Sequence, residues 1–116
     1  MHLVEKPITR SKLFEMAQER FGDLVKAVVD VQREIMTIGG DLHSDEEAFL
    51  LEQGSQQQDL WGINLYPDKY GDEFIEFDSI INLRPSQGNS SRDVKDPVIR
   101  QKVKEIIAQL IEENAI

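Results

Sequence analysis

Two runs of alternating apolar and polar residues in the middle of the chain constrain its fold most. Successive side chains of an extended strand point to opposite sides, so in residues 60–66 one face carries Trp61, Ile63 and Leu65. In residues 74–83 the same alternation puts on one face Ile75, Phe77, Ile81 and Leu83. The intervening PDKYGDE contains Pro and Gly, which are typical of a turn. The sequence therefore predicts an antiparallel hairpin, 60–66/74–83.

The end of the chain has the pattern of an amphipathic helix. Asp96 followed by Pro97 is a helix cap with proline at the first helical position. Apolar residues then recur every three or four positions, at Ile99, Val103, Ile106 and Leu110. We expect the last turn of this helix to fray, since Glu112 and Glu113 oppose the helix dipole.

Residues 24–38 are compatible with two interpretations. Seven of the fourteen residues in 25–38 are β-branched, and the polar sequence Gln-Arg-Glu at 32–34 separates two apolar runs, which favours a hairpin within 25–38. The apolar spacing from Phe14 to Ile38 also fits one long helix through Gly22. We favour the hairpin and keep the helix continuation as the alternative.

Two shorter helices complete the predicted secondary structure. Residues 11–21 carry apolar side chains at helical spacing between Thr9 or Ser11 as a cap and Gly22 as a stop; they are Leu13, Phe14, Ala17 and Phe21. Ser44 and Glu47 have the spacing of a capping box before an apolar stretch that Gly54 ends. We predict a single α+β domain, residues 1–116, in which the C-terminal helix and one or two other helices pack on an antiparallel sheet.

The charge balance and the missing residue types exclude several classes of function. The formal net charge is -9, and residues 41–78 alone hold 11 acidic residues and one lysine, which makes generic nucleic-acid binding unlikely as a role. The chain has no cysteine, so disulfides, thiol nucleophiles and Cys-ligated metals are absent. No apolar run is long enough for a signal peptide or a membrane span, and we expect a cytoplasmic protein with no membrane partner.

The segment GDLHSDEE is the first candidate for chemistry. His43 lies there among acidic residues, and imidazole with carboxylates holds Zn, Mn or Fe in many proteins, so His43, Asp45 and Glu46 are the candidate metal ligands. Asp78 lies near Glu76 on the second predicted strand, and both carboxylates are expected near Asn64. His43, Asp45 and Asp78 are therefore the candidate catalytic residues. The simpler interpretation is that the acids stabilise a helix start and His43 bonds a neighbouring carbonyl.

The segment RPSQGNSSRD, residues 84–93, is the second candidate. Its small polar residues allow backbone N–H groups to turn inward, and its two arginines are suited to bidentate anion binding. The candidate anion- or ligand-binding residues are Arg84, Ser86, Asn89 and Arg92, with Trp61 as a stacking surface. An ordinary loop and a core tryptophan are the alternatives.

Three segments, GGDLHSDEEAFLLEQGS, DLWGINLYP and IEFDSIINLRPSQGNSSR, together resemble a small uncharacterised prokaryotic family known as a domain of unknown function. The resemblance extends over nearly the whole chain, and it implies short, stand-alone cytoplasmic proteins. It assigns no catalytic residue. It does suggest that His43, Trp61 and residues 84–92 form one surface.

These observations favour a small non-enzymatic binding or regulatory module that acts through protein–protein association, with a protein partner or a second copy of itself as a homodimer. The size, the uneven charge and the lack of a convincing catalytic constellation support this hypothesis. The alternative is a small metal-assisted hydrolase acting on an anionic substrate. We expect no cofactor for the module, and a divalent metal for the hydrolase.

Overall fold

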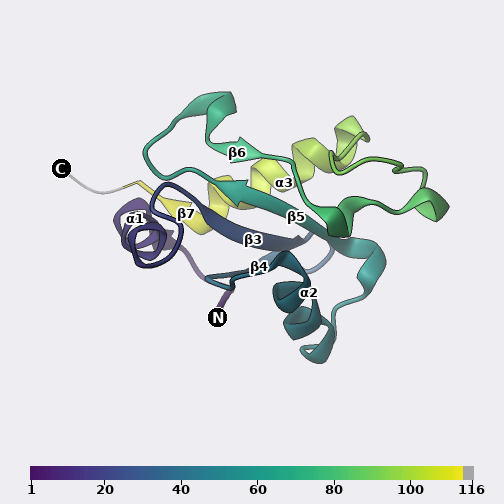
Figure 1. The fold of residues 1–116 in the computed structure, drawn as a ribbon, viewed down its shortest axis with the longest axis horizontal. Helices are drawn as coiled ribbons and strands as arrows, with labels where there is room; N and C mark the ends of the chain where they lie inside the picture. The colour runs from purple at the N-terminus through teal and green to yellow at the C-terminus, as the bar shows by residue number, and fades with distance from the viewer. Residues whose placement is uncertain (114–116) are drawn as a thin grey trace.

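A five-stranded antiparallel sheet forms the centre of the fold in the computed structural model, which describes residues 1–113 (Figure 1). Its strand order is β1-β4-β3-β5-β6. The strands are β1 (His2–Val4), β3 (Val25–Asp30), β4 (Ile35–Ile38), β5 (Leu60–Leu65) and β6 (Ile75–Glu76). The prediction of an α+β fold with an antiparallel sheet is confirmed.

The hairpin predicted within residues 25–38 is present as β3 and β4, which excludes the helix continuation. The polar break between the two apolar runs is the turn. The Asp30 side chain accepts hydrogen bonds from the backbone N–H groups of Gln32 and Arg33, both at 2.9 Å, and Glu34 adopts a positive φ of 58°. An aspartate that bonds the backbone ahead of it favours a turn over a helix.

Alternation along the central strands separates two cores. Trp61, Ile63 and Leu65 are buried in the main core together with residues of α1 (Arg10–Glu19) and α3 (Pro97–Leu110). The opposite face of the sheet packs Val28 and Leu60 against Leu50 of α2 (His43–Glu52). In Figure 1, α3 accordingly runs behind the sheet and α2 lies in front of it. The predicted packing of the C-terminal helix and a second helix on the sheet is confirmed.

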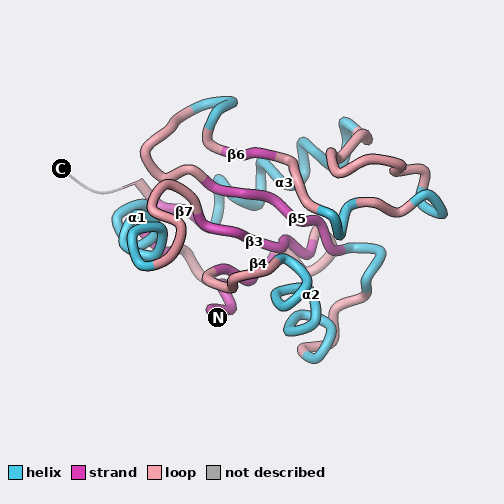
Figure 2. The backbone as a smooth tube through the Cα atoms, viewed as in Figure 1, coloured by secondary structure: helices cyan, strands magenta, loops and turns pink. Residues whose placement is uncertain are grey.

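The second predicted strand, 74–83, was too long. Strand β6 covers only Ile75–Glu76, and residues 80–82 form a turn of 3₁₀ helix, which Figure 2 shows in cyan after the short magenta strand. The Asn82 side-chain amide takes the place of the strand. Its Nδ2 donates to the Gly62 carbonyl at 2.9 Å, and its Oδ1 accepts from the Gly62 N–H at 2.8 Å. The edge of β5 is thus satisfied without a longer β6.

The shortened strand changes where its apolar side chains lie. Phe77 is buried in the main core, as predicted, and Ile75 packs against it. Ile81 instead packs on the α2 side, and Leu83 is exposed. The prediction that Ile81 and Leu83 share a face with Phe77 was wrong, because the 3₁₀ turn interrupts the alternation of side chains that a strand would have.

Two details of the predicted helices were also wrong. The capping box does not form, since α2 begins at His43 with Leu42 as its cap and Ser44 lies inside the helix. In α1, Leu13 and Ala17 are buried, whereas Phe14 and, beyond the helix, Phe21 are 46% and 42% exposed. The cap at Thr9 is confirmed, because its side chain accepts from the Lys12 N–H at 3.1 Å.

The segment after α3 is a strand, which corrects the prediction of a frayed last turn. Residues Ile111–Glu112 form β7, which pairs in parallel with β2 (Ile8–Thr9). Ile111 is buried in the main core. The apolar contact of Ile111 and the strand pairing outweigh the unfavourable charges at the helix end. None of the helices within residues 1–113 has the length and the apolar composition that a membrane-spanning segment requires.

Candidate functional site

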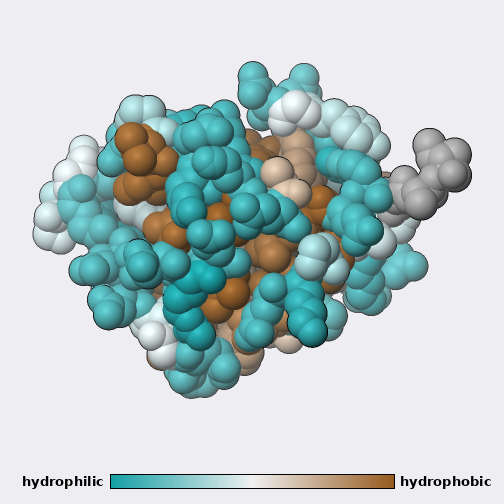
Figure 3. Space-filling view, turned by 180° about the vertical axis from the view of Figure 1, so that it is seen from behind, coloured by the Kyte–Doolittle hydropathy of each residue, from teal (hydrophilic) through white to brown (hydrophobic). Residues whose placement is uncertain are grey.

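A hollow of about 480 Å³ lies between α3 and the segment that leads into β6. We call it the Arg10 groove, and it is formed chiefly by Arg10, Phe74, Ile75, Lys104, Ile107 and Ile111. Its volume falls within the roughly 300–1,000 Å³ of sites for small molecules. Figure 3 shows the molecule from the side that carries α3, where brown apolar surface lies between teal hydrophilic residues.

Arg10, the first residue of α1, is only 9% exposed although it is charged. Its Nη1 donates to the carbonyl oxygens of Pro67 and Lys69 at 3.0 and 3.1 Å. Its Nε and Nη2 donate to the two carboxylate oxygens of Glu113 at 2.8 and 2.9 Å. The guanidinium is therefore hydrogen-bonded on both edges, and one edge holds a carboxylate in the bidentate arrangement that arginine favours.

Two aromatic rings fix the plane of this guanidinium. Its central carbon lies 4.3 Å from the centre of the Tyr70 ring and 4.1 Å from that of Phe74. Phe74 belongs to the Arg10 groove, whereas Tyr70 lines a second hollow of about 570 Å³ with Phe14 and Pro67. Arg10 lines both hollows, and the rings hold it ready for a planar anion.

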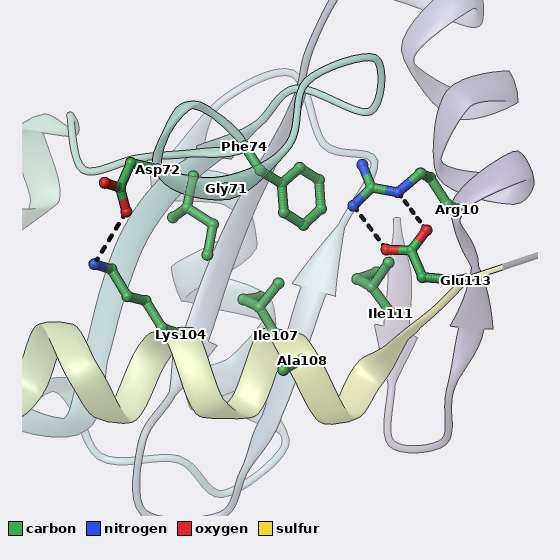
Figure 4. Close-up of a pocket in the computed structure, with 10 residues that line it drawn as sticks. Arg10, Gly71, Asp72, Phe74, Lys104, Ile107, Ala108, Ile111 and Glu113 are labelled. Atoms are coloured by element: carbon green, nitrogen blue, oxygen red, sulfur yellow. Dashed lines mark hydrogen bonds and ion pairs between the residues drawn. The ribbon is translucent and has the colours of Figure 1, made fainter.

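Lys104 of α3 lies at the other end of the groove, as Figure 4 shows, with Phe74, Ile107 and Ile111 between it and Arg10. Its Nζ is 4.0 Å from Oδ1 of Asp72, whose side chain is fully exposed. The groove thus has an apolar middle and a cation at each end.

The local sequence explains how these side chains meet. Strand β2 ends directly before Arg10, and its parallel pairing aligns Ile8 with Ile111 and Thr9 with Glu112. Arg10 and Glu113, which directly follow these two strands, then meet side by side. Sequence reasoning missed this site. The signal was Ile111, an apolar residue that continues past the helix and suits a buried strand position.

His43 has the structural role that the simpler interpretation gave it. The ring is buried, and its Nε2 lies 2.7 Å from the Ile63 carbonyl oxygen, so Nε2 carries a proton and donates. Burial lowers the pKa of His43, although the bond to Ile63 partly opposes this shift. At neutral pH the ring is therefore uncharged and anchors α2 to β5.

The three candidate metal ligands do not converge on one point, because His43 bonds Ile63 and Glu46 bonds Gly40. Asp45 is exposed, whereas Glu46 is buried and its Oε2 accepts from the Gly40 N–H at 3.1 Å. Burial raises the pKa of Glu46 to about 9, so this side chain is neutral at pH 7. In the described part of the chain, no three His, Asp or Glu side chains come together as metal ligands.

Asp78 and Arg92 are brought together, with Nε and Oδ1 2.6 Å apart. The expected neighbourhood of Asn64 and the strand carboxylates is also present, since Asn64 Nδ2 donates to Glu76 Oε1 at 2.8 Å. Both Asp78 and Arg92 act electrostatically on His43. His43, Asp78 and Arg92 therefore lie in one region, in which the charged groups of Asp78 and Arg92 pair with each other.

Arg84 lies over Trp61, with its central carbon 4.1 Å from the ring centre, and donates to the carbonyls of Gln57 and Leu60. Trp61 itself is 1% exposed, so it is a core residue. Asn89 is buried and donates to three carbonyls of its own loop region, while Ser86 is exposed. The loop 84–93 is thus held by its own hydrogen bonds, and Arg84 is directed to the end of β5.

Comparison with known proteins gives one match. The family model described as "Protein of unknown function (DUF5674)" matches residues 2–110, which is nearly the whole chain. No curated protein and no solved structure matches. The resemblance to an uncharacterised family that the sequence suggested is confirmed.

Proposed function

We propose that this chain, which belongs to the DUF5674 family, is a small non-enzymatic binding module that takes up a carboxylate-bearing apolar ligand in the Arg10 groove. One observation carries the proposal. A buried arginine, held by two carbonyls and two rings, gives its remaining edge to a carboxylate that is itself 63% exposed.

The contacts of Arg10 favour exchange of that carboxylate. The carbonyls of Pro67 and Lys69 and the rings of Tyr70 and Phe74 orient the guanidinium whether or not Glu113 is bound. A binding site whose cation is already oriented loses little entropy when a ligand arrives. Glu113, by contrast, lies just after the two-residue strand β7. A ligand carboxylate is therefore able to replace it with the same bidentate geometry.

The apolar walls add affinity for the rest of the ligand. Phe74, Ile107 and Ile111 line the groove next to the cation. Burial of apolar ligand surface contributes roughly 25 cal/mol per Å² before the cost of association. An acid with a short hydrocarbon body fits this combination better than a small inorganic anion or a neutral oil.

Octanoate is a suitable probe, with 1-octanol as its uncharged match, in isothermal titration calorimetry. We expect saturable binding of octanoate and at least about tenfold weaker binding of octanol, because charge-assisted hydrogen bonds contribute about 1.5–3 kcal/mol. Ala108→Phe fills the groove from an exposed helix position and should abolish octanoate binding. Gln109→Phe, the adjacent exposed position outside the groove, is the control. If octanoate does not bind, or binds Ala108→Phe equally, the proposal fails.

Competition between Glu113 and the ligand for Arg10 can be measured in a second experiment. Glu113→Gln removes the charge that competes for Arg10, so octanoate should bind this variant roughly fivefold more tightly. Equal or weaker binding to Glu113→Gln would show that Glu113 does not compete for the site.

We also propose, as the charge pattern suggested, that the module acts through association with a protein partner or a second copy. Helices α2 and α3 lie on opposite faces of the sheet, and α2 carries Asp45, Glu47 and Glu52 while α3 carries Arg100, Lys102 and Lys104. Opposite charge on two faces favours contact between copies at low salt. Light scattering should then give a mass above 13.3 kDa that falls to the monomer value in 0.5 M salt. A monomer at every salt concentration would exclude a homodimer.

A further inference from the structure

The Arg10 groove has a second cation at the end opposite Arg10. Lys104 reaches Asp72 only at 4.0 Å, the outer limit for an ion pair, and Asp72 is fully exposed. Exposed pairs of this length contribute little stability because water and salt screen them. The charge of Lys104 is therefore available to an incoming anion at small cost.

The helix sets the distance between the two ends. Lys104 and Ala108 are spaced by four residues, so they lie on one face of α3, and Ile111 follows directly after the last residue of that helix. At 1.5 Å per residue, the six steps from Lys104 to Leu110, the last residue of α3, cover about 9 Å. Figure 4 shows Arg10 beside Ile111 and Lys104 at the far end, with Phe74 and Ile107 between them.

We infer that the ligand of the groove is an apolar molecule with an acidic group at each end, such as a medium-chain dicarboxylate. This inference rests on the proposed function and specifies its ligand class. One carboxylate replaces Glu113 at Arg10, and the other replaces Asp72 at Lys104. The hydrocarbon body lies on Phe74, Ile107 and Ile111. The exchange leaves the charge balance of both cations unchanged, so no buried charge loses its partner.

The test compares suberate with octanoate, which have the same number of carbon atoms and differ by one acidic end. An extended chain reaches about 3.3–3.6 Å for every three bonds, so the two carboxyl carbons of suberate lie roughly 8 Å apart, which suits the groove. Titrations are done in 0.15 M salt with the full chain. Suberate should bind roughly fivefold more tightly than octanoate, and succinate, which is too short, should show no such gain.

Lys104→Gln identifies the second end. In this variant the ratio of the suberate affinity to the octanoate affinity should fall to about one. Lys102→Gln is the matched control, because Lys102 lies on the same helix but pairs with Glu34 outside the groove. If octanoate binds but suberate is no tighter, or if Lys104→Gln keeps the gain, the inference is overturned and the proposed function stands. If neither acid binds, both are overturned.

Discussion

Glu46 allows a quantitative test of the packing between α2 and the sheet. The side chain is fully buried, and its one hydrogen bond is from the Gly40 N–H at 3.1 Å. Among the described residues, its Oε1 has no partner. Burial raises the pKa of Glu46 from 4.5 to about 9, so at pH 7 the folded protein holds a proton there that the unfolded chain has released.

The size of the effect follows from linkage. Because the pKa of Glu46 is raised in the folded protein, the contribution of its neutral carboxyl to the free energy of unfolding is complete below pH 4.5. This contribution falls as the pH rises towards 9. At pH 7, about 2.5 pH units above 4.5, the loss is about 3 kcal/mol at roughly 1.36 kcal/mol per unit. This figure depends only on the unfolded pKa as long as the folded one lies above 7. Glu46→Gln keeps the shape and the acceptor for Gly40 and does not ionise, so it should be about 3 kcal/mol more stable at pH 7.

Urea unfolding followed by circular dichroism between pH 4.5 and 8.5 measures this difference. We expect the two proteins to be nearly equally stable at pH 4.5 and to diverge as the pH rises. Asp45→Asn is the control, because it also removes one carboxylate from the same helical turn but at an exposed position. A constant difference between Glu46→Gln and the parent at pH 5 and pH 8 would refute the reasoning.

Three further measurements test the fold and the alternative function. Phe77→Ala should lower the free energy of unfolding by about 3–5 kcal/mol, since the ring is buried under the Arg100 guanidinium; a loss below about 1 kcal/mol would contradict this burial. Gly62→Ala should lose about 1–3 kcal/mol because its Cβ would lie 2.6 Å from Ser79 Cβ, and adding Ser79→Gly should restore part of the loss. Millimolar Zn²⁺, Mn²⁺ or Mg²⁺ should leave the Tm unchanged, and a rise of several degrees would favour the metal-assisted hydrolase.

The elements whose apolar residues recur at the regular spacing of a strand or a helix were predictable from the sequence. Trp61, Ile63 and Leu65 alternate because one face of β5 packs in the main core, whereas the other face carries Gly62 and Asn64, and Val103, Ile106 and Leu110 recur because one face of α3 is buried. The prediction of a strand over residues 74–83 was wrong because a side chain makes the hydrogen bonds that the backbone of a longer strand would have made. Asn82 gives Gly62 the hydrogen bonds of a strand, so residues 80–82 need not be extended. Apolar alternation does not reveal such a substitution.

The candidate site was less predictable than the fold. His43, Arg84 and Arg92 were conspicuous in the sequence, and their side chains bond carbonyls or a neighbouring carboxylate. Arg10 was not conspicuous, because what distinguishes it is tertiary: two carbonyls, two rings and a carboxylate from other parts of the chain. Motif reasoning works on residues that are close in sequence, whereas this groove joins α1, the segment before β6 and the end of α3.

The contact between Arg10 and Glu113 joins residues that are 103 positions apart. During synthesis the arginine emerges early, and its carboxylate partner emerges only after α3. Contacts of such separation form late, because loop closure must be achieved before they contribute. The groove is therefore absent from any intermediate in which α3 has not docked. Uptake of an acid by the refolding chain should appear together with the final folding phase, so ligand binding reports complete assembly.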